Sequence, residues 1–331
     1  MKLCVIGLGW VADAMHGPAY LKYRKENPGL ELTACCDIDA EKAKAYQNKF
    51  GFLRMYTEWD KMLETENPDA VCLLTPPAQI TVIAEKILSS GIPLLMEKPP
   101  GEAKEDTLRL IEAAKIKGTP HLVAFNRRYC PLIIKMREIS ASLSGGSGSM
   151  QSLQYNMFRI GRTEAEFFIT AIHAVDTVRY ICDSDYKSLS FKYRSYQELG
   201  EGVSDIHIHG TMKDGTVVTL NICPVAGINS ESAVMHFHDH SIYVDHIGTA
   251  LYPDGRLVHV HNNSTVLNIN YADIPDAGER FEREGFYCEN KLFFDAVLTG
   301  KTPPGSLESA LQSVEIADCI RSRKDKIVMQ L

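Results

Sequence analysis

The stretch VIGLGWVA, residues 5–12, joins the end of an apolar run to a G-x-G-x-x-A pattern at Gly7, Gly9 and Ala12. The two glycines permit a tight turn and a close approach of the backbone to a pyrophosphate, and the small third residue lets a helix pack closely on the strand. Unpaired N–H groups at the start of that helix favour an anion. The stretch predicts a strand, a phosphate-binding turn and a helix, although a glycine turn without a ligand has the same pattern.

Apolar runs alternate with helix-period segments from Lys2 to about Phe125. Helical patterns cover 40–50 and 78–91, and the second ends at Gly91, a residue type that commonly ends helices in a left-handed conformation. Strands that are apolar throughout and alternate with helices indicate a parallel sheet covered on both faces. We therefore predict an N-terminal, doubly wound Rossmann domain over residues 1–125. Its apolar runs are KLCVIGLG (2–9), LELTACCD (30–37), PDAVCLLTPP (68–77), IPLLMEKPP (92–100) and HLVAF (121–125).

The second strand of this domain ends in an acidic residue, Asp37. A carboxylate at this place can accept hydrogen bonds from both ribose hydroxyls of NAD, whereas it would repel the 2′-phosphate of NADP. Asp39 adds a second negative charge, and Ile38 stands where an arginine would favour NADP. The charges favour NAD over NADP as the cofactor.

Beyond residue 125 the pattern changes to shorter runs in which apolar and polar residues alternate, separated by turns. We predict a C-terminal α+β domain over residues 126–331 with an open, mostly antiparallel sheet, for substrate binding and oligomerisation. Helical segments are expected near 165–183 and 281–323, and a loop at 142–149. The expected strand segments are SLQYNMFRI (152–160), SLSFKYRSY (188–196), DIHIHGTM (205–212), TVVTLNICPV (216–225), AVMHFHDHSIYVDH (233–246), LVHVHNN (257–263) and STVLNINY (264–271).

The composition excludes several classes of protein. A length of 331 residues favours two domains, and a formal net charge of −7 provides no basic field for nucleic acid or an anionic membrane. The sequence has no run of 18 apolar residues and no export signal after Met1. Its nine cysteines, an odd number without a C-x-x-C, fit reduced thiols. We expect a soluble, cytoplasmic protein that binds a small molecule.

The strand at 92–97 stops at Glu97, Lys98, Pro99 and Pro100. Ligands of parallel sheets collect at the carboxyl ends of the strands, so both charged side chains are expected where a nicotinamide would lie. The prolines cannot continue the hydrogen-bonded ladder and fix the direction in which the chain leaves. A surface ion pair that closes the strand is the alternative interpretation.

The order GLGWVA, CCD, LLTPP, MEKPP and FNRRYCP resembles the Gfo/Idh/MocA oxidoreductase family, and IHAVDTVRY and the segment from 286 extend the resemblance over nearly the whole chain. The resemblance implies that Lys98 hydrogen-bonds the reacting oxygen and that the Lys98–Pro99 peptide is cis. It also implies a set of cofactor-binding residues: Gly7, Gly9, Trp10, Val11, Ala12, Asp37, Thr75, Pro76, Glu97, Lys98 and Asn126.

In IHAVDTVRY, His173 and Asp176 are three residues apart on a predicted helix and share one face. A carboxylate beside an imidazole can fix its tautomer and support its protonated form, so the pair could relay the hydroxyl proton during oxidation. A structural histidine is the alternative. Two departures from the family pattern, Ile169 in place of an aspartate and Ile80 in place of a histidine, put the usual polyol substrate in doubt.

Eight of the eleven histidines fall between 207 and 261. Alternate residues of a strand share a face, so HIH, HFHDH and HVH could each gather their imidazoles. A zinc or nickel site is geometrically possible. We favour a solvent-exposed or subunit-pairing face, with no bound metal, in a homodimer or homotetramer.

These observations lead to an NAD-dependent dehydrogenase or reductase of a sugar, sugar acid or cyclitol, with Lys98 polarising the oxygen and His173 moving the proton. A glycosidase or lyase that retains its NAD and oxidises the sugar transiently is one alternative. A non-catalytic NAD-binding sensor is the other.

Overall fold

The computed structural model describes residues 1–144 and 149–329, which form two compact units. The first unit contains Met1–Asn126 and Arg280–Val314, and the second contains Arg127–Glu279 and the residues from Glu315 onward. These units differ from the sequence-based division at residue 125 chiefly because the segment 280–314 lies with the N-terminal sheet. The domain boundary itself stays a prediction.

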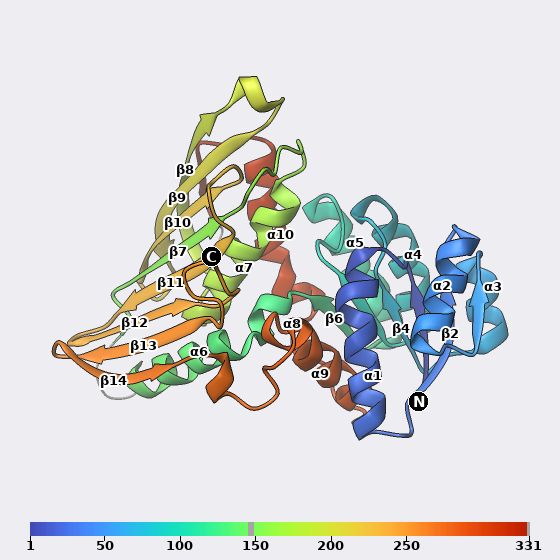
Figure 1. The fold of residues 1–331 in the computed structure, drawn as a ribbon. Helices are drawn as coiled ribbons and strands as arrows, with labels where there is room; N and C mark the ends of the chain where they lie inside the picture. The colour runs from blue at the N-terminus through green and yellow to red at the C-terminus, as the bar shows by residue number, and fades with distance from the viewer. Residues whose placement is uncertain (145–148, 330–331) are drawn as a thin grey trace. The chain divides into compact units, whose positions relative to one another are not determined.

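The first unit is built on a six-stranded parallel sheet in the order β3-β2-β1-β4-β5-β6 (Figure 1). This is the Rossmann order, and the N-terminal part of the fold prediction is confirmed. The pattern did not reveal β3, whose three residues are too few to show a period. The strands are β1 (Lys2–Ile6), β2 (Glu31–Cys36), β3 (Arg54–Tyr56), β4 (Ala70–Leu73), β5 (Leu94–Glu97) and β6 (His121–Ala124).

Helices of the first unit pack in groups on this sheet. Helix α1 contacts α2 and α9, while α4 contacts α5. Aromatic side chains of α1, α2 and α9, including Tyr20, Tyr46 and Phe293, form one core with β-strand residues such as Leu3 and Leu32. The helices are η1 (Ala12–His16), α1 (Gly17–Glu26), α2 (Ala40–Phe50), α3 (Trp59–Glu66), α4 (Pro77–Ser90), α5 (Lys104–Lys117), α8 (Arg280–Arg283) and α9 (Phe286–Thr299).

The second unit contains a nine-stranded sheet in the order β14-β13-β12-β11-β7-β10-β9-β8-β15. Every neighbouring pair is antiparallel except β7 and β10. The prediction of a mostly antiparallel C-terminal sheet is therefore confirmed. The strands are β7 (Ser152–Phe158), β8 (Tyr186–Ser195), β9 (Ser204–Met212), β10 (Val217–Cys223), β11 (Ser230–His236), β12 (His240–Asp245), β13 (Arg256–His261), β14 (Ser264–Ile269) and β15 (Lys326–Val328).

One face of this sheet forms a core with helices, because alternate strand residues such as Ile206 and Ile208 point inward while His207 and His209 are exposed. Residues of α6, α7 and the end of α10 complete that core. The sequence-predicted loop at 142–149 begins too early, since Ser142–Ser144 still belong to α6; residues 145–148 lie outside the described residues. The helices are α6 (Pro131–Ser144) and α7 (Phe168–Cys182), with short 3-10 turns η2 (Asn126–Tyr129), η3 (Gln197–Leu199) and η4 (Tyr271–Asp273). Helix α10 (Leu307–Arg321) belongs to the first unit up to Val314 and to the second unit from Glu315.

The segment 233–246 corrects one expectation. It forms a hairpin, with β11 ending at His236 and β12 beginning at His240, so HFHDH does not lie on one strand. The turn between them contains Asp239 at φ +63°, a conformation that Asp tolerates well. His240 instead stacks on His261 of β13 at 4.1 Å between ring centroids.

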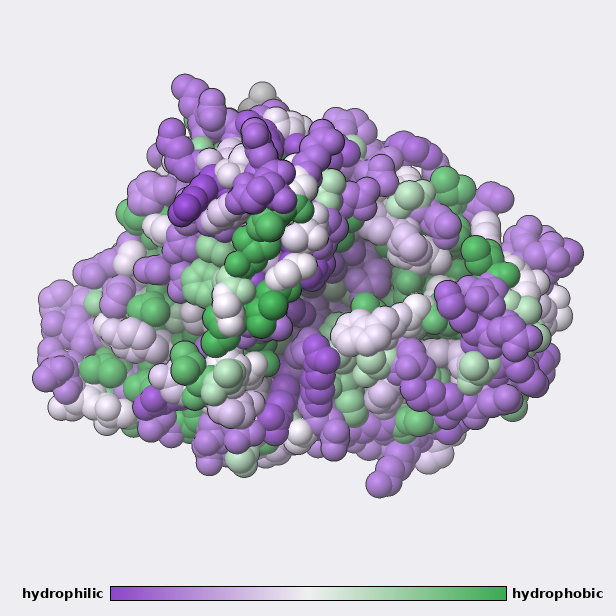
Figure 2. Space-filling model, turned by 45° about the horizontal axis from the view of Figure 1, so that its top comes forward, coloured by the Kyte–Doolittle hydropathy of each residue, from purple (hydrophilic) through white to green (hydrophobic). Residues whose placement is uncertain are grey.

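Polar side chains cover most of the face in Figure 2, with smaller apolar areas between them. Within 1–144 and 149–329, no helix is both long and apolar enough to cross a bilayer. None of the cysteines in these ranges forms a disulfide.

Candidate functional site

The glycine turn follows β1 and has the geometry that its sequence predicts. Gly7 has φ +88°, and a Cβ atom there would lie 2.8 Å from backbone atoms of Leu74 and Thr75. Glycine is required because any side chain would collide with the end of β4. A Cβ at Gly9, in contrast, would meet no atom within 4 Å. The backbone of Gly9 is thus open for a close approach by a ligand.

A helix starts directly after this turn and contains a π turn over Ala12–His16. The Gly17 N–H donates to the Ala12 carbonyl, five residues back. Ala12 is 1% exposed, as expected of a small residue that lets the helix pack on the strand. Turns of this kind occur often at functional sites, where they redirect one or two side chains. Here the π turn contributes Met15 and His16 to the buried side.

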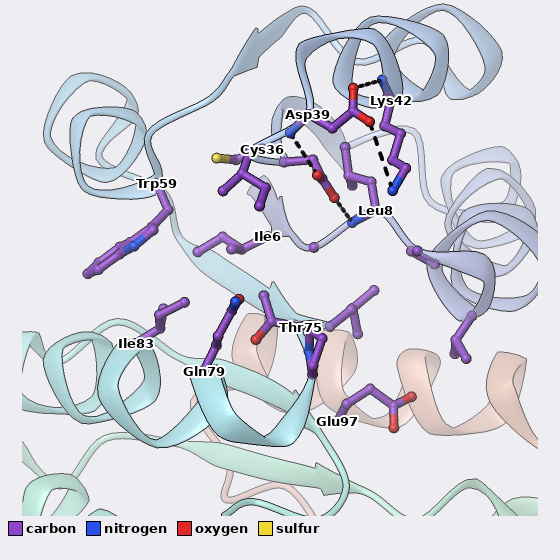
Figure 3. Close-up of a pocket in the computed structure, with 18 of the residues that line it drawn as sticks. Ile6, Leu8, Cys36, Asp39, Lys42, Trp59, Thr75, Gln79, Ile83 and Glu97 are labelled. Carbon is purple, nitrogen blue, oxygen red and sulfur yellow. Dashed lines mark hydrogen bonds and ion pairs between the residues drawn. The ribbon is translucent and has the colours of Figure 1, made fainter. Parts of the chain in front are cut away.

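Asp37 joins the end of β2 to the glycine turn. Its Oδ2 accepts the Leu8 N–H at 2.9 Å, and its Oδ1 accepts the Asp39 N–H at 3.0 Å (Figure 3). Asp39 caps helix α2 by accepting from the N–H groups of Glu41 and Lys42. The Asp37 carboxylate is therefore fixed in orientation by two backbone donors, and each oxygen retains a lone pair for a further donor.

Glu97 and Lys98 end β5 at the same edge of the sheet. The Lys98–Pro99 peptide is cis, as the family resemblance implies. Glu97 Oε2 accepts the Lys98 N–H at 3.0 Å, and Glu97 Oε1 lies 3.4 Å from Nε2 of the buried His16. The Glu97 carboxylate therefore contacts a buried imidazole as well as the backbone of Lys98.

A pocket of about 650 Å³ lies along the carboxyl ends of β1, β2, β4 and β5. This volume is in the range of small-molecule and cofactor sites. Trp59 and Glu97 lie toward opposite ends of the view in Figure 3, while Thr75 and Gln79 point into the pocket from the β4–α4 junction. The lining includes Gly7, Gly9, Trp10, Val11, Ala12, Asp37, Thr75, Pro76, Glu97 and Lys98.

Asn126 is the one expected cofactor residue that does not line this pocket. Its Nδ2 donates to the Glu284 carbonyl at 2.8 Å, so the amide links β6 to the segment after α8. Sequence reasoning assigned no role to several other lining residues, among them Trp59, Gln79 and Ile83. Trp59 follows β3, the strand too short to be found, so no local pattern assigned it to the sheet edge.

The pocket residues fit a dinucleotide. The buried Thr75 Oγ1 has no hydrogen-bond partner within the described part of the chain, and it faces the pocket. Gly7 and Gly9 form a cradle that a Cβ would fill, and Asp37 supplies an oriented acceptor. An unpartnered hydroxyl, a glycine cradle and an acidic residue are the donors and acceptors that a pyrophosphate and a ribose require.

His173 and Asp176 lie on α7 of the second unit. His173 is 7% exposed and Asp176 is 1% exposed. Both oxygens of Asp176 accept from Arg128, with Nε to Oδ2 at 2.7 Å and a terminal nitrogen to Oδ1 at 2.6 Å. The sequence did not anticipate this bidentate ion pair, since 48 residues separate its members. Ile169 precedes His173 by one turn and is partly buried.

A second buried ion cluster surrounds Glu231, which sequence reasoning missed because nothing in its local pattern marks it. Its carboxylate accepts from Arg127 at 2.8 Å, from Arg159, and from the Tyr155 hydroxyl at 2.7 Å. Burial raises the pKa of this carboxyl, but the two guanidinium groups oppose it and hold the pKa well below its usual value. His246 contacts the same hydroxyl at 2.9 Å, and burial lowers its pKa to about 4.

Within the described ranges, no three His, Cys, Asp or Glu side chains form a group that could hold a metal ion. His240 Nδ1 lies 2.9 Å from His259 Nε2, so these imidazoles hydrogen-bond one another. Ile80, the second departure from the family pattern, is fully buried on α4 and belongs to the core.

A sheet of this order, with a glycine turn after its first strand and an acidic residue after its second, is the fold of dinucleotide-binding enzymes, and the chain is an NAD-binding oxidoreductase. Residues 1–125 match the model of the Gfo/Idh/MocA family, described as an oxidoreductase family with an NAD-binding Rossmann fold. The match covers the N-terminal Rossmann part of the chain.

Similar proteins cover nearly the whole chain. Inositol 2-dehydrogenase of Salmonella typhimurium is 22% identical over 98% of this chain and 94% of its own length. Among solved structures, a levoglucosan dehydrogenase in complex with NADH and levoglucosan has a TM-score of 0.85 at 18% identity, covering 100% of both chains. An oxidoreductase from Agrobacterium radiobacter in complex with NAD+, L-tartaric acid and magnesium has a TM-score of 0.83 at 17% identity, covering 99% of this chain and 98% of its own.

Proposed function

We propose that the protein is an NAD-dependent dehydrogenase or reductase that interconverts an alcohol and a ketone on a sugar, sugar acid or cyclitol. The observation that carries the proposal is the pocket at the carboxyl ends of β1, β4 and β5, in which the glycine turn and Lys98 line one cavity. The similarity to an inositol dehydrogenase and a levoglucosan dehydrogenase supports the substrate class.

The residues of the first unit divide into two roles. Gly7, Gly9, Asp37 and Thr75 hold the dinucleotide, which when bound accepts or donates the hydride. The Lys98 ammonium donates a hydrogen bond to the substrate oxygen and stabilises the negative charge that develops as its proton leaves. Separate residues thus hold the cofactor and act on the substrate.

His173 accepts the hydroxyl proton when the alcohol is oxidised and returns it when the ketone is reduced. Oxidation of the carbinol releases a proton, which His173 would take, while the bound dinucleotide would supply the acceptor for the hydride. Asp176 is proposed as the partner of this imidazole. Arg128 already pairs with the Asp176 carboxylate. Asp176 therefore stabilises a protonated His173 less than a carboxylate without such a partner would.

The proposed cofactor is NAD in preference to NADP. The Asp37 carboxylate, oriented by Leu8 and Asp39, faces the place of the ribose hydroxyls and would repel a 2′-phosphate. Lys42 is one of two lysines among the lining residues, and its Nζ lies 3.9 Å from Asp39 Oδ2, which offsets its charge.

The function is tested by a screen of inositols, aldoses, levoglucosan and sugar acids with NAD, recorded at the NADH absorbance. Net accumulation of NADH, in proportion to added alcohol, is expected for at least one of them. Turnover of a glycoside without net NADH would instead indicate a lyase or glycosidase that retains its cofactor. NAD binding without turnover of any substrate would indicate a sensor.

A further inference from the structure

A hydrogen-bonded chain runs behind Lys98 within the first unit. It starts at Asn290 of α9, passes through His16 of the π turn, and reaches Glu97 at the end of β5. His16 and Asn290 are both fully buried, and neither lines the pocket. These residues lie close together although 274 positions separate His16 from Asn290.

The orientation of the Asn290 amide follows from its second contact. Its Nδ2 lies 2.7 Å from the Phe286 carbonyl, which can only accept, so this atom is the amide nitrogen. The same nitrogen lies 3.0 Å from His16 Nδ1, whereas Asn290 Oδ1 lies 3.3 Å from it. Asn290 therefore donates one N–H to Phe286 and the other to His16, and His16 Nδ1 accepts.

The other ring nitrogen gives the same assignment. His16 Nε2 faces Glu97 Oε1 at 3.4 Å, and a carboxylate oxygen can only accept. A neutral imidazole with its proton on Nδ1 would turn a lone pair toward this oxygen. Both ends of the ring thus agree on the tautomer with the proton on Nε2 and a lone pair on Nδ1.

We propose that Asn290 and His16 are positioning residues for Lys98: Asn290 fixes the Nε2–H tautomer of His16, and His16 holds the Glu97 carboxylate, whose second oxygen binds the Lys98 N–H. The role in turnover rests on the proposed function of Lys98. The tautomer and the support of the Lys98 backbone do not depend on it.

The packing of the ring supports this assignment. His16 contacts Phe286 edge-on, with 5.2 Å between ring centroids, and Tyr20 at 6.0 Å. These aromatic neighbours restrict rotation of the imidazole, so a change of its proton position could not be compensated by a flip of the ring. Because the π turn sets the direction of His16, it aligns the helix after the glycine turn with the end of β5.

The tautomer is tested without any substrate, by long-range proton–nitrogen NMR of the histidine rings in the NAD-loaded protein. His16→Gln, which removes one ring, identifies the signal. The expected result is a neutral ring with Nδ1 unprotonated. A ring protonated on Nδ1, alone or together with Nε2, would overturn the proposal.

The support of Lys98 is tested by amide hydrogen exchange of the peptide that spans β5. Pro99 and Pro100 have no N–H, so Lys98 is the last exchangeable amide before them. His16→Leu should accelerate exchange there at least about tenfold, because it removes a hydrogen bond to a charged group. His16→Gln, which places an N–H donor near Nε2, should stay close to the unmutated protein.

Tyr23→Phe is the matched control. It also removes a hydrogen bond between α1 and α9, the partly buried contact of Tyr23 Oη with Asp295 at 2.7 Å, which does not involve Glu97. Exchange at β5 should not change in this variant. If exchange accelerates equally in Tyr23→Phe and His16→Leu, the effect comes from a general loss of packing and the proposal is overturned. It is also overturned if His16→Leu does not accelerate exchange.

The effect on turnover is measured with myo-inositol or levoglucosan, whichever the unmutated protein oxidises faster. His16→Leu and Asn290→Leu should lower kcat at least about tenfold and leave the Kd for NAD within about threefold, and His16→Gln should recover most of kcat. Unchanged kcat in both leucine variants would overturn the role in turnover. If neither alcohol is oxidised, the proposed function fails, while NMR and exchange still decide the positioning of Lys98.

Discussion

Asp37 Oδ2 accepts the backbone N–H of Leu8 at 2.9 Å, so the acidic end of β2 is tied directly to the glycine turn after β1. The carboxylate proposed to select the cofactor is thereby joined to the loop proposed to hold its pyrophosphate. A substitution at Asp37 should affect both cofactor affinity and cofactor choice.

Asp37→Ala should raise the Kd for NAD at least about tenfold, because two hydrogen bonds to a charged acceptor are lost, and should narrow the preference for NAD over NADP. Calorimetric titration with each cofactor measures both quantities. NADP affinity equal to or tighter than NAD affinity in the unmutated protein would contradict the assignment.

Alanine at Gly7 and at Gly9 should have different effects. Gly7→Ala places a Cβ 2.8 Å from the backbone of Leu74 and Thr75 at φ +88°, so it should lower the free energy of unfolding by about 1–3 kcal/mol and abolish NAD binding. The Cβ of Gly9→Ala would lie in open space in the free protein, so the free energy of unfolding should stay within about 0.5 kcal/mol of the unmutated protein while NAD binding is lost. Denaturant unfolding and calorimetry of the two variants make the comparison; equal destabilisation would contradict it.

Lys98→Met and His173→Ala should each lower turnover at least about a hundredfold with NAD affinity nearly unchanged, because both are proposed to meet the substrate oxygen. Steady-state kinetics with the best substrate of the screen, with calorimetry for NAD, test this. Full activity in either variant would show that the residue has been misassigned.

Ile169→Asp tests why the family's usual carboxylate is absent one turn before His173. If the chain is a polyol dehydrogenase that lost this group, activity on inositols or simple sugars should rise. If Ile169 contacts an apolar part of another substrate, activity on that substrate should fall, because a charge is buried without a partner. The two rates are compared in the same assay.

The buried His246 predicts a pH dependence of stability. Its pKa is lowered from 6.5 to about 4, so between these pH values the unfolded chain binds a proton that the folded protein does not. Stability should therefore fall as pH drops through this window, by about 1.4 kcal/mol per unit. Asp245, whose pKa burial raises to about 6, acts in the opposite direction.

His246→Gln isolates this contribution, because Asp245 is present in both proteins. The difference in free energy of unfolding between pH 6.5 and 4.5 should be smaller in the variant by about 2 kcal/mol. Urea titrations at both pH values measure it. An unchanged difference would mean that His246 titrates normally in the folded protein.

The uncovered face of the nine-stranded sheet is predicted to pair subunits into a dimer or tetramer, because an extended sheet face with half-buried apolar residues needs cover. Tyr243, 43% exposed on β12, should lie in this contact, so Tyr243→Glu should weaken assembly. Leu108→Glu on α5, at similar exposure, is the control. A monomer at neutral pH by light scattering would refute the prediction.

The sequence by itself determined the parallel, doubly wound character of the first sheet, the glycine turn, the acidic end of β2 and the position of Lys98 at the end of a strand. These features are local: a run of apolar residues, a turn and a charged end are encoded within about ten consecutive positions. The alternating strands of the second unit follow from the same kind of pattern. Short elements such as β3 and the turn within 233–246 lie below the length at which a period becomes visible.

Only the tertiary structure brought Asn290 to His16 and Glu97, Arg128 to Asp176, and two arginines to Glu231. Each of these contacts joins residues that are far apart in the chain, and no local sequence pattern around either residue predicts its partner. Their pairing depends on how helices and strands pack and on the register of the sheet, and burial then requires that every charge and donor find a partner. The sequence motif thus placed Lys98 at the end of a strand. The packing of α9 against the π turn determined which side chains contact Glu97 and, through it, the Lys98 backbone.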